Sequence, residues 1–124
     1  MGMKTILIVD DNADTRLLLS ARLKANHYHT IFAADALQAM SVARKEQPDA
    51  ILLDLGLPGG NGMMVLERLK ANTSLRGIPV IIVTADDPLV AEARALEAGA
   101  IAFLQKPVDQ DKLMAAVQQA VGTT

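Results

Sequence analysis

Three short runs of apolar residues in the 124-residue chain contain no alternating polar positions. They lie at residues 6–9, 50–53 and 79–83 and are rich in isoleucine, leucine and valine. A run without polar alternation predicts a strand that is covered on both faces, as in a parallel sheet. Two further strands are expected at residues 28–33 and 102–105, where polar or small residues favour the edges of the sheet.

Segments with apolar residues at helical spacing separate these strands. The first helix is expected from about residue 12 to 25, with Asn26 as a left-handed C-terminal cap. The second stops before Pro48, the third starts near Gly62, the fourth runs from near Pro88 to Gly99, and the last spans about 110–121. The side chains expected on the inner sides of these helices are Leu18, Leu19, Ala21, Leu23, Ala36, Ala39, Met40, Ala43, Val65, Leu66, Leu69, Leu89, Ala93, Leu96, Leu113, Val117, Ala120 and Val121.

The strand–helix alternation repeats five times and predicts an α/β domain. Right-handed crossovers place helices on both faces of a five-stranded parallel sheet. The length fits one domain over residues 1–124, with a core at about 4–121. In open sheets of this kind the ligand crevice lies beyond the carboxyl ends of the strands, which indicates where the chemistry is to be sought.

Polar residues follow the apolar strands at that edge. Asp10 and Asp11 end the first strand, Asp54 ends the third, Thr84 ends the fourth, and Lys106 ends the fifth. Because carboxyl ends of parallel strands meet at one edge, three carboxylates, a hydroxyl and an ammonium group are expected to converge.

Each of these residues also has a plain structural interpretation. The Asp10–Asp11 pair suits a helix N-cap, and Asp54 suits a turn before Pro58. Thr84 fits a strand end by β-propensity, and Lys106 fits an ordinary exposed lysine. Unrelated caps and turns need not meet at one point, so the conjunction favours a functional site.

The charges of this group predict a divalent cation, because three carboxylates and one lysine leave an excess of about two negative charges. Oxygen ligands from few side chains favour Mg²⁺, with Mn²⁺ as a substitute. The chain has no cysteine, and its two histidines, His27 and His29, are expected near the opposite end of the sheet, so a zinc site has no support. With Mg²⁺ bound, an ionised aspartate can attack phosphorus and form an acyl phosphate without a general base.

Composition excludes several other classes of protein. The net charge is −2 with 12 basic and 14 acidic residues, and no basic run or aromatic–basic interleaving supports nucleic-acid binding. No segment reads as a signal peptide or a membrane span. A chain without cysteine fits a cytoplasmic location.

Nearly the whole chain resembles the receiver domain of two-component response regulators. The resemblance rests on the order and spacing of five segments, none of which is specific alone: 8–11 (IVDD), 53–62 (LDLGLPGGNG), 83–85 (VTA), 98–100 (AGA) and 103–107 (FLQKP). It implies a flavodoxin-like (βα)5 fold with strand order 2-1-3-4-5. It also implies a signalling domain that promotes its own phosphorylation and dephosphorylation and is not a conventional turnover enzyme.

The same resemblance assigns roles to the site residues. Asp54 would be the phosphoacceptor, and Asp11, Asp54 and the backbone carbonyl of Gly56 would bind Mg²⁺, with Asp10 acting through a coordinated water. Thr84 and Lys106 would contact the phosphoryl oxygens, and the Lys106–Pro107 bond would be cis. The donor would be a phosphohistidine on a sensor histidine kinase or a histidine phosphotransfer protein.

Signal output is expected to follow from a movement of Thr84 and an inward turn of Phe103, which alter the surface of the fourth helix, fifth strand and fifth helix. Phe103 stands where tyrosine is commoner in the family, and packing alone also accounts for it. The apolar residues Ile101 and Ala102 are assigned to the core, with a partner-binding patch as the alternative. The target of the signal is either a separate protein or an effector domain outside this sequence.

Three other functions compete with an active receiver. A phosphatase of the haloacid dehalogenase type needs a second aspartate two residues after Asp54, where this chain has Gly56. A flavodoxin-like cofactor binder needs a phosphate loop without carboxylates after the first strand, where Asp10 and Asp11 lie. A degenerate receiver that serves only as a constitutive interaction module ranks above these two, but the full set of site residues favours the active receiver.

Overall fold

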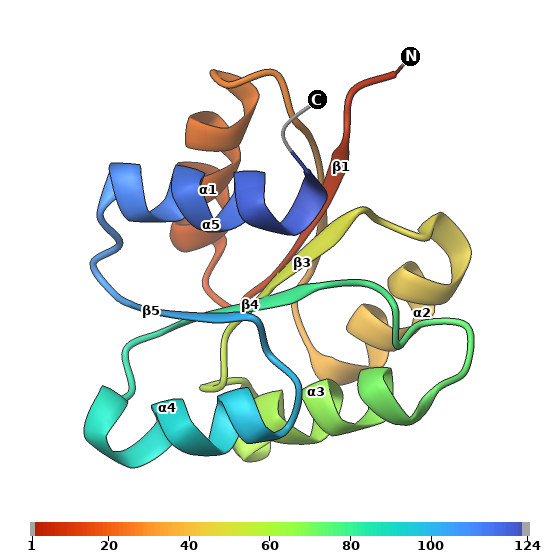
Figure 1. Cartoon of the computed structure of the whole chain (residues 1–124), viewed down its shortest axis with the longest axis vertical. Helices are drawn as coiled ribbons and strands as arrows, with labels where there is room; N and C mark the ends of the chain where they lie inside the picture. The colour runs from red at the N-terminus through yellow and green to blue at the C-terminus, as the bar shows by residue number, and fades with distance from the viewer. Residues whose placement is uncertain (1, 123–124) are drawn as a thin grey trace.

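The chain folds into one layer of strands between two layers of helices (Figure 1). The computed structural model describes residues 2–122. The elements, in chain order, are β1 (Thr5–Val9), α1 (Ala13–Lys24), β2 (His29–Ala33), α2 (Ala36–Glu46), β3 (Ala50–Leu53), a 3-10 turn (Pro58–Gly60), α3 (Gly62–Ala71), β4 (Val80–Thr84), α4 (Pro88–Glu97), β5 (Ala102–Gln105) and α5 (Gln110–Val121). No helix in this part of the chain is both long and apolar enough to cross a bilayer.

All neighbouring strands pair in parallel, in the order β2-β1-β3-β4-β5. The predicted fold class and strand order are therefore confirmed, and the two strands with polar residues, β2 and β5, form the edges. His29 pairs with Thr5 at the amino end of β1. Both histidines are exposed there, far along the sheet from the strand ends that carry the aspartates.

The sheet separates two hydrophobic cores, which explains the lack of polar alternation in the central strands. Leu7 and Val9 of β1 point into a core that is covered by α2, α3 and α4. Ile6 and Ile8 point into the opposite core under α1 and α5. Each of these four side chains is at most 1% exposed, so both faces of β1 are apolar.

The inward face of α1 differs from the prediction. Leu18 is 54% exposed and Ala21 is also exposed, whereas Leu19, Ser20 and Leu23 are buried. The buried Ser20 hydroxyl lies 2.7 Å from the hydroxyl of Thr30 in β2. Because of this hydrogen bond, a serine can be buried in the interface between α1 and β2. The buried side of α1 therefore includes Ser20 in place of the predicted Leu18 and Ala21.

The end of α1 also differs from the prediction. The left-handed residue is His27 (φ 68°), not Asn26. The Asn26 side chain donates a hydrogen bond to the carbonyl of Arg22 (2.9 Å), and Tyr28 N–H bonds the carbonyl of Leu23 (3.1 Å). The chain therefore continues one residue further before it reverses direction.

The apolar side predicted to face inward on α4 faces solvent instead. Leu89 is 95% exposed, Leu96 is 42% exposed, and Ala93 is exposed as well. The helix packs on the sheet through alanines: Ala95 is fully buried, and Ala91 and Ala98 are partly buried against the same core. Ile101, for which the sequence predicts a place in the core, is 40% exposed, while Ala102 is partly buried.

The Ser20–Thr30 hydrogen bond is expected to stabilise the α1–β2 contact. Replacing Ser20 by alanine leaves the buried Thr30 hydroxyl without its partner and should cost about 1–3 kcal/mol of unfolding free energy. The double variant Ser20→Ala/Thr30→Val should be more stable than the sum of the single changes predicts, since no buried polar group then remains unpaired. Urea unfolding followed by circular dichroism measures both effects.

Ser41→Ala on the exposed side of α2 is the matched control, with an expected change of less than about 0.5 kcal/mol. Strictly additive effects of the two core substitutions would contradict the pairing.

Candidate functional site

The fold brings the predicted polar residues to one edge of the sheet. Asp10 directly follows β1, and Asp54 directly follows β3, whose last residue pairs with the last residue of β1. Thr84 ends β4 beside Gln105 of β5, and Lys106 is the next residue. Parallel pairing in this register is what makes residues far apart in sequence neighbours in the site.

One lysine joins two of the aspartates. The Lys106 ammonium nitrogen lies 2.7 Å from Asp10 Oδ2 and 3.0 Å from Asp54 Oδ2. Asp10 is 2% exposed and Asp54 is 7% exposed, so both carboxylates are largely removed from water. Buried charges of this kind are stable only when they are paired and hydrogen-bonded, and Lys106 supplies the pairing.

The environment of Lys106 keeps its ammonium group charged. Burial alone lowers the pKa of this group, but hydrogen bonds to Asp10 and Asp54 and their negative charges outweigh burial. The net result is a pKa above the ordinary value for lysine. Lys106 is therefore a fixed positive charge beside Asp54 at neutral pH.

Asp11 completes an acidic group at the mouth of the site. Asp10, Asp11 and Asp54 each offer a carboxylate oxygen, and these atoms lie within 4.8 Å of one another. Asp11 is exposed and, among the described residues, forms no ion pair within 4.0 Å. An oxygen-only donor set with more negative charge than Lys106 neutralises fits a hard divalent cation such as Mg²⁺.

Backbone contacts fix the orientation of both buried carboxylates. Asp10 Oδ1 accepts a hydrogen bond from the N–H of Asn12 (2.9 Å), and Asp54 Oδ1 accepts one from the N–H of Gly56 (2.9 Å). The N-cap of α1 is Asn12, so the interpretation of Asp10 and Asp11 as helix caps is wrong. Asp54 does stabilise the turn that follows it, and this contact is compatible with a role at the site.

Gly56 lies directly beside the Asp54 carboxylate. A β-carbon at position 56 would lie 3.4 Å from Asp54 Oδ1, which is ordinary van der Waals contact. Thr84 is fully buried; its hydroxyl accepts a hydrogen bond from the N–H of Asp86 (3.3 Å), and its carbonyl accepts one from the N–H of Lys106 (2.8 Å). Thr84 thus connects the β4–α4 loop to the lysine segment. The Lys106–Pro107 peptide bond is cis.

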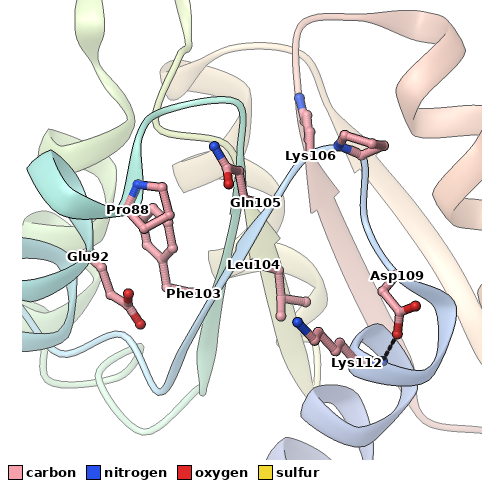
Figure 2. A pocket seen from close by; sticks show the side chains of 9 residues that line it. Pro88, Glu92, Phe103, Leu104, Gln105, Lys106, Asp109 and Lys112 are labelled. Carbon is pink, nitrogen blue, oxygen red and sulfur yellow. Dashed lines mark hydrogen bonds between the residues drawn. The ribbon is translucent and has the colours of Figure 1, made fainter.

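The Phe103 side chain lies on one face of β5, and the side chains of its sequence neighbours Ala102 and Leu104 lie on the other face. It packs against the α2–α3–α4 core, whereas Ala102 and Leu104 pack against the opposite one. Phe103 also lines a pocket of about 380 Å³ between α4 and α5 (Figure 2). The other residues of this pocket are Pro88, Glu92, Leu104, Gln105, Lys106, Pro107, Asp109 and Lys112.

Two contacts near the acidic group were not anticipated from the sequence. Arg16 of α1 donates a hydrogen bond to the carbonyl of Asp10 (2.6 Å). A β-carbon on Gly62 would lie 2.4 Å from the carbonyl oxygen of Asp54 and 2.3 Å from Leu55 Cα. The start of α3 therefore touches the main chain at Asp54, and a glycine at the first position of a predicted helix was the available signal.

A parallel sheet of this order, with three carboxylates and a lysine at its carboxyl edge, defines the receiver class of two-component signalling domains. The family model of the response regulator receiver domain matches residues 6–118. The chain belongs to this family.

Two similar proteins match this chain over nearly their whole length. The chain is 40% identical to sporulation initiation phosphotransferase F of Bacillus subtilis over 119 residues, which cover 96% of this chain and 94% of that protein. It is 34% identical to the polar-differentiation response regulator DivK of Brucella anthropi, with 96% and 97% coverage. It is 41% identical to the response regulator PleD of Caulobacter vibrioides over 91% of this chain, but spans only 25% of PleD.

Solved structures of a response regulator and of a receiver domain have the same fold as this chain. A response regulator from Chloroflexus aurantiacus superposes with a TM-score of 0.90 at 29% identity, covering 96% of this chain and 98% of that one. The receiver domain of the sensor histidine kinase PA1611 from Pseudomonas aeruginosa has a TM-score of 0.88 at 30% identity, with 98% and 100% coverage. That structure contains a magnesium ion coordinated in its active-site cleft.

Gly62 is expected to be required for the geometry at Asp54. In Gly62→Ala the new methyl group overlaps main-chain atoms, so the start of α3 or the Asp54 segment must move, at a cost of about 1–3 kcal/mol or more. Thermal and urea unfolding measure this cost.

Gly77→Ala is the matched control. A β-carbon at Gly77 meets no atom within 4 Å, and its φ is not in the left-handed region. This substitution should leave stability unchanged or raise it by about 0.4–1 kcal/mol. Equal stability of the Gly62 and Gly77 variants would contradict the close contact.

Proposed function

We propose that Asp54 accepts a phosphoryl group from a phosphohistidine in a Mg²⁺-dependent reaction. The observation that supports this most directly is the position of its carboxylate. Asp54 Oδ2 lies 3.0 Å from the Lys106 ammonium, and an Asp54 oxygen lies within 4.8 Å of oxygens of Asp10 and Asp11. Asp54 is a nucleophile that lies beside the positive charge of Lys106 and within a carboxylate cluster suited to a divalent cation. Phosphoryl transfer depends on positioning and charge stabilisation, and this arrangement supports both.

The residues that would hold the metal are Asp11, Asp54 and the backbone carbonyl of Gly56, with Asp10 acting through a water. When bound, Mg²⁺ would neutralise negative charge on the carboxylates and on the phosphoryl oxygens. Mn²⁺ takes the same oxygen ligands and is expected to substitute. The magnesium ion in the cleft of the PA1611 receiver supports this part of the proposal.

In the transfer, an ionised Asp54 oxygen forms a bond to phosphorus as the phosphorus–nitrogen bond of the phosphohistidine breaks. The electron pair of that bond stays on the imidazole nitrogen, and no proton has to leave Asp54. Lys106 would then contact a phosphoryl oxygen, since its ammonium already lies beside the acceptor carboxylate. The Thr84 hydroxyl would exchange its bond from Asp86 N–H for a contact with another phosphoryl oxygen.

Residues 1–124 would act as one receiver domain in the cytoplasm, phosphorylated by a sensor histidine kinase or a histidine phosphotransfer protein. The movement of Thr84 would draw in the β4–α4 loop and allow Phe103, which lines the pocket between α4 and α5, to turn inward. The α4–β5–α5 surface would thereby change its affinity for a downstream protein or an effector domain. The domain would promote its own phosphorylation and dephosphorylation without being a conventional turnover enzyme.

Incubation with acetyl phosphate and Mg²⁺ should add one labile phosphoryl group per chain, because this small donor needs no docking surface. The gain, measured by intact mass, should disappear with a chelator or in Asp54→Asn, return with Mn²⁺, and persist in Asp111→Asn, which changes an exposed aspartate on α5. A phosphohistidine protein donor serves as the second substrate.

Labelling of Asp54→Asn equal to that of the unchanged chain would reject Asp54 as the acceptor. Failure with both donors would favour a constitutive interaction module.

Thr84 is expected to transmit phosphorylation to α4 and β5. In Thr84→Ala, Asp54 should still be phosphorylated, but the amide chemical shifts of α4 and β5 should move much less than in the unchanged domain, because the hydroxyl that follows the phosphoryl group is gone. NMR spectra before and after addition of acetyl phosphate measure this. Thr73→Ala, at an exposed loop position, is the control. Equal shift changes in the Thr84 and Thr73 variants would contradict the switch.

A further inference from the structure

The main chain of the segment that carries Lys106 makes few hydrogen bonds beyond the end of the sheet. Lys106 N–H donates to the carbonyl of Thr84 (2.8 Å), which is the last contact between β5 and β4. The next fixed point is Asp109, the N-cap of α5, whose side chain accepts a hydrogen bond from the N–H of Lys112 (2.9 Å). Pro107 and Val108 lie between these anchors, and proline has no N–H to donate.

One side chain reaches the main chain between these two anchors. Arg22 Nη1 of α1 donates a hydrogen bond to the carbonyl of Val108 at 2.8 Å, across 86 positions of sequence. Among the described residues, 2–122, the main chain of Pro107 and Val108 makes no other hydrogen bond. The Arg22 side chain forms no ion pair with a carboxylate within 4.0 Å in the same part of the chain. The polar contact described for this side chain is therefore the one to the loop.

Close packing restrains this segment on one side. Val108 is partly buried against the core under α1 and α5, and on the other side a pocket of about 220 Å³ lies between α1 and the lysine segment. Its lining consists of Thr15, Leu18, Leu19, Arg22, Val83, Lys106, Pro107 and Val108. The side of the loop that faces this pocket has fewer packing contacts than a residue inside a core, so the hydrogen bond from Arg22 adds a restraint on that side.

The opposite end of the contact is rigid. Leu19 and Leu23 of α1 are buried against the sheet, and Arg16 of the same helix bonds the carbonyl of Asp10. We infer that Arg22 is a positioning residue that ties the Lys106 segment to α1 through the Val108 carbonyl and so fixes the ammonium group beside Asp10 and Asp54. This inference rests on the proposed phosphoryl transfer for its functional consequence, since a displacement of about 1 Å in a charge-stabilising group can cost up to 10²-fold in rate.

The test compares Arg22→Met, which keeps an unbranched stem but loses the donor, with Arg22→Lys, which keeps a donor and the charge. Arg44→Met is the matched control, because Arg44 is an exposed arginine on α2 outside this segment. Hydrogen exchange measured by NMR reports positioning without phosphorylation. The amide of Lys106, whose N–H donates to the Thr84 carbonyl, should exchange about tenfold faster in Arg22→Met, while the buried amides of β1 and β3 keep the rates seen in Arg44→Met.

Phosphorylation kinetics test the consequence. With acetyl phosphate at saturating Mg²⁺, Arg22→Met should lower the rate about fivefold, Arg22→Lys should recover most of it, and Mg²⁺ affinity by calorimetry should stay within about twofold, because the metal ligands lie on other loops. In a Lys106→Ala background, Arg22→Met should cause no further loss, since its effect passes through Lys106.

Each other outcome overturns a defined claim. Unchanged exchange of the Lys106 amide rejects the positioning role, whether or not the domain is phosphorylated. Faster exchange with an unchanged phosphorylation rate, or an equal loss in the Lys106→Ala background, rejects action through Lys106. If the unchanged chain accepts no phosphoryl group from either donor, the proposed function fails, while the exchange result still decides whether Arg22 holds the segment.

Discussion

The arrangement of the site depends on one cation held between two buried carboxylates. Asp10 and Asp54 end neighbouring central strands, and Lys106 reaches both from the edge strand at 2.7 and 3.0 Å. Two like charges about 4 Å apart repel by on the order of 4 kcal/mol at an effective dielectric constant of about 20. The lysine offsets this repulsion for two carboxylates but not for Asp11, and the remaining negative charge favours a divalent cation at the proposed metal site. The same ion pairs therefore hold the ends of β1, β3 and β5 together and leave an excess of negative charge beside them.

Most of the fold and the location of the site could be predicted because both follow from parallel pairing. A strand covered on both faces has no polar alternation, so β1, β3 and β4 stand out in the sequence, and their polar ends must share an edge. The ion pair between Asp10 and Lys106 could not be predicted. Adjacent residues after a strand point in different directions, and only the structure distinguishes the buried Asp10, which meets Lys106, from the exposed Asp11.

Helix faces were predicted less well, because hydrophobicity does not decide which side of a helix is buried. In α1 the buried face includes Ser20, whose hydroxyl finds Thr30, so the more apolar Leu18 remains outside. In α4 three alanines lie against the sheet while Leu89 and Leu96 face solvent. Small side chains at a close helix–sheet contact carry little hydrophobic signal, and a prediction from apolar spacing therefore selects the wrong side.

The same alanine contact bears on the proposed switch. Hydrophobic stabilisation scales with the apolar area buried, so a helix that packs through alanines is held less firmly than one that packs through leucines. Segments with few buried apolar contacts are the ones that move at low cost in free energy. The helix α4 meets this condition at the end of the loop that begins with Thr84, and its large apolar side chains, Leu89 and Val90, already face outward. A movement of this helix would displace a ready-made apolar surface without having to expose a core, which is the physical property that an output helix needs.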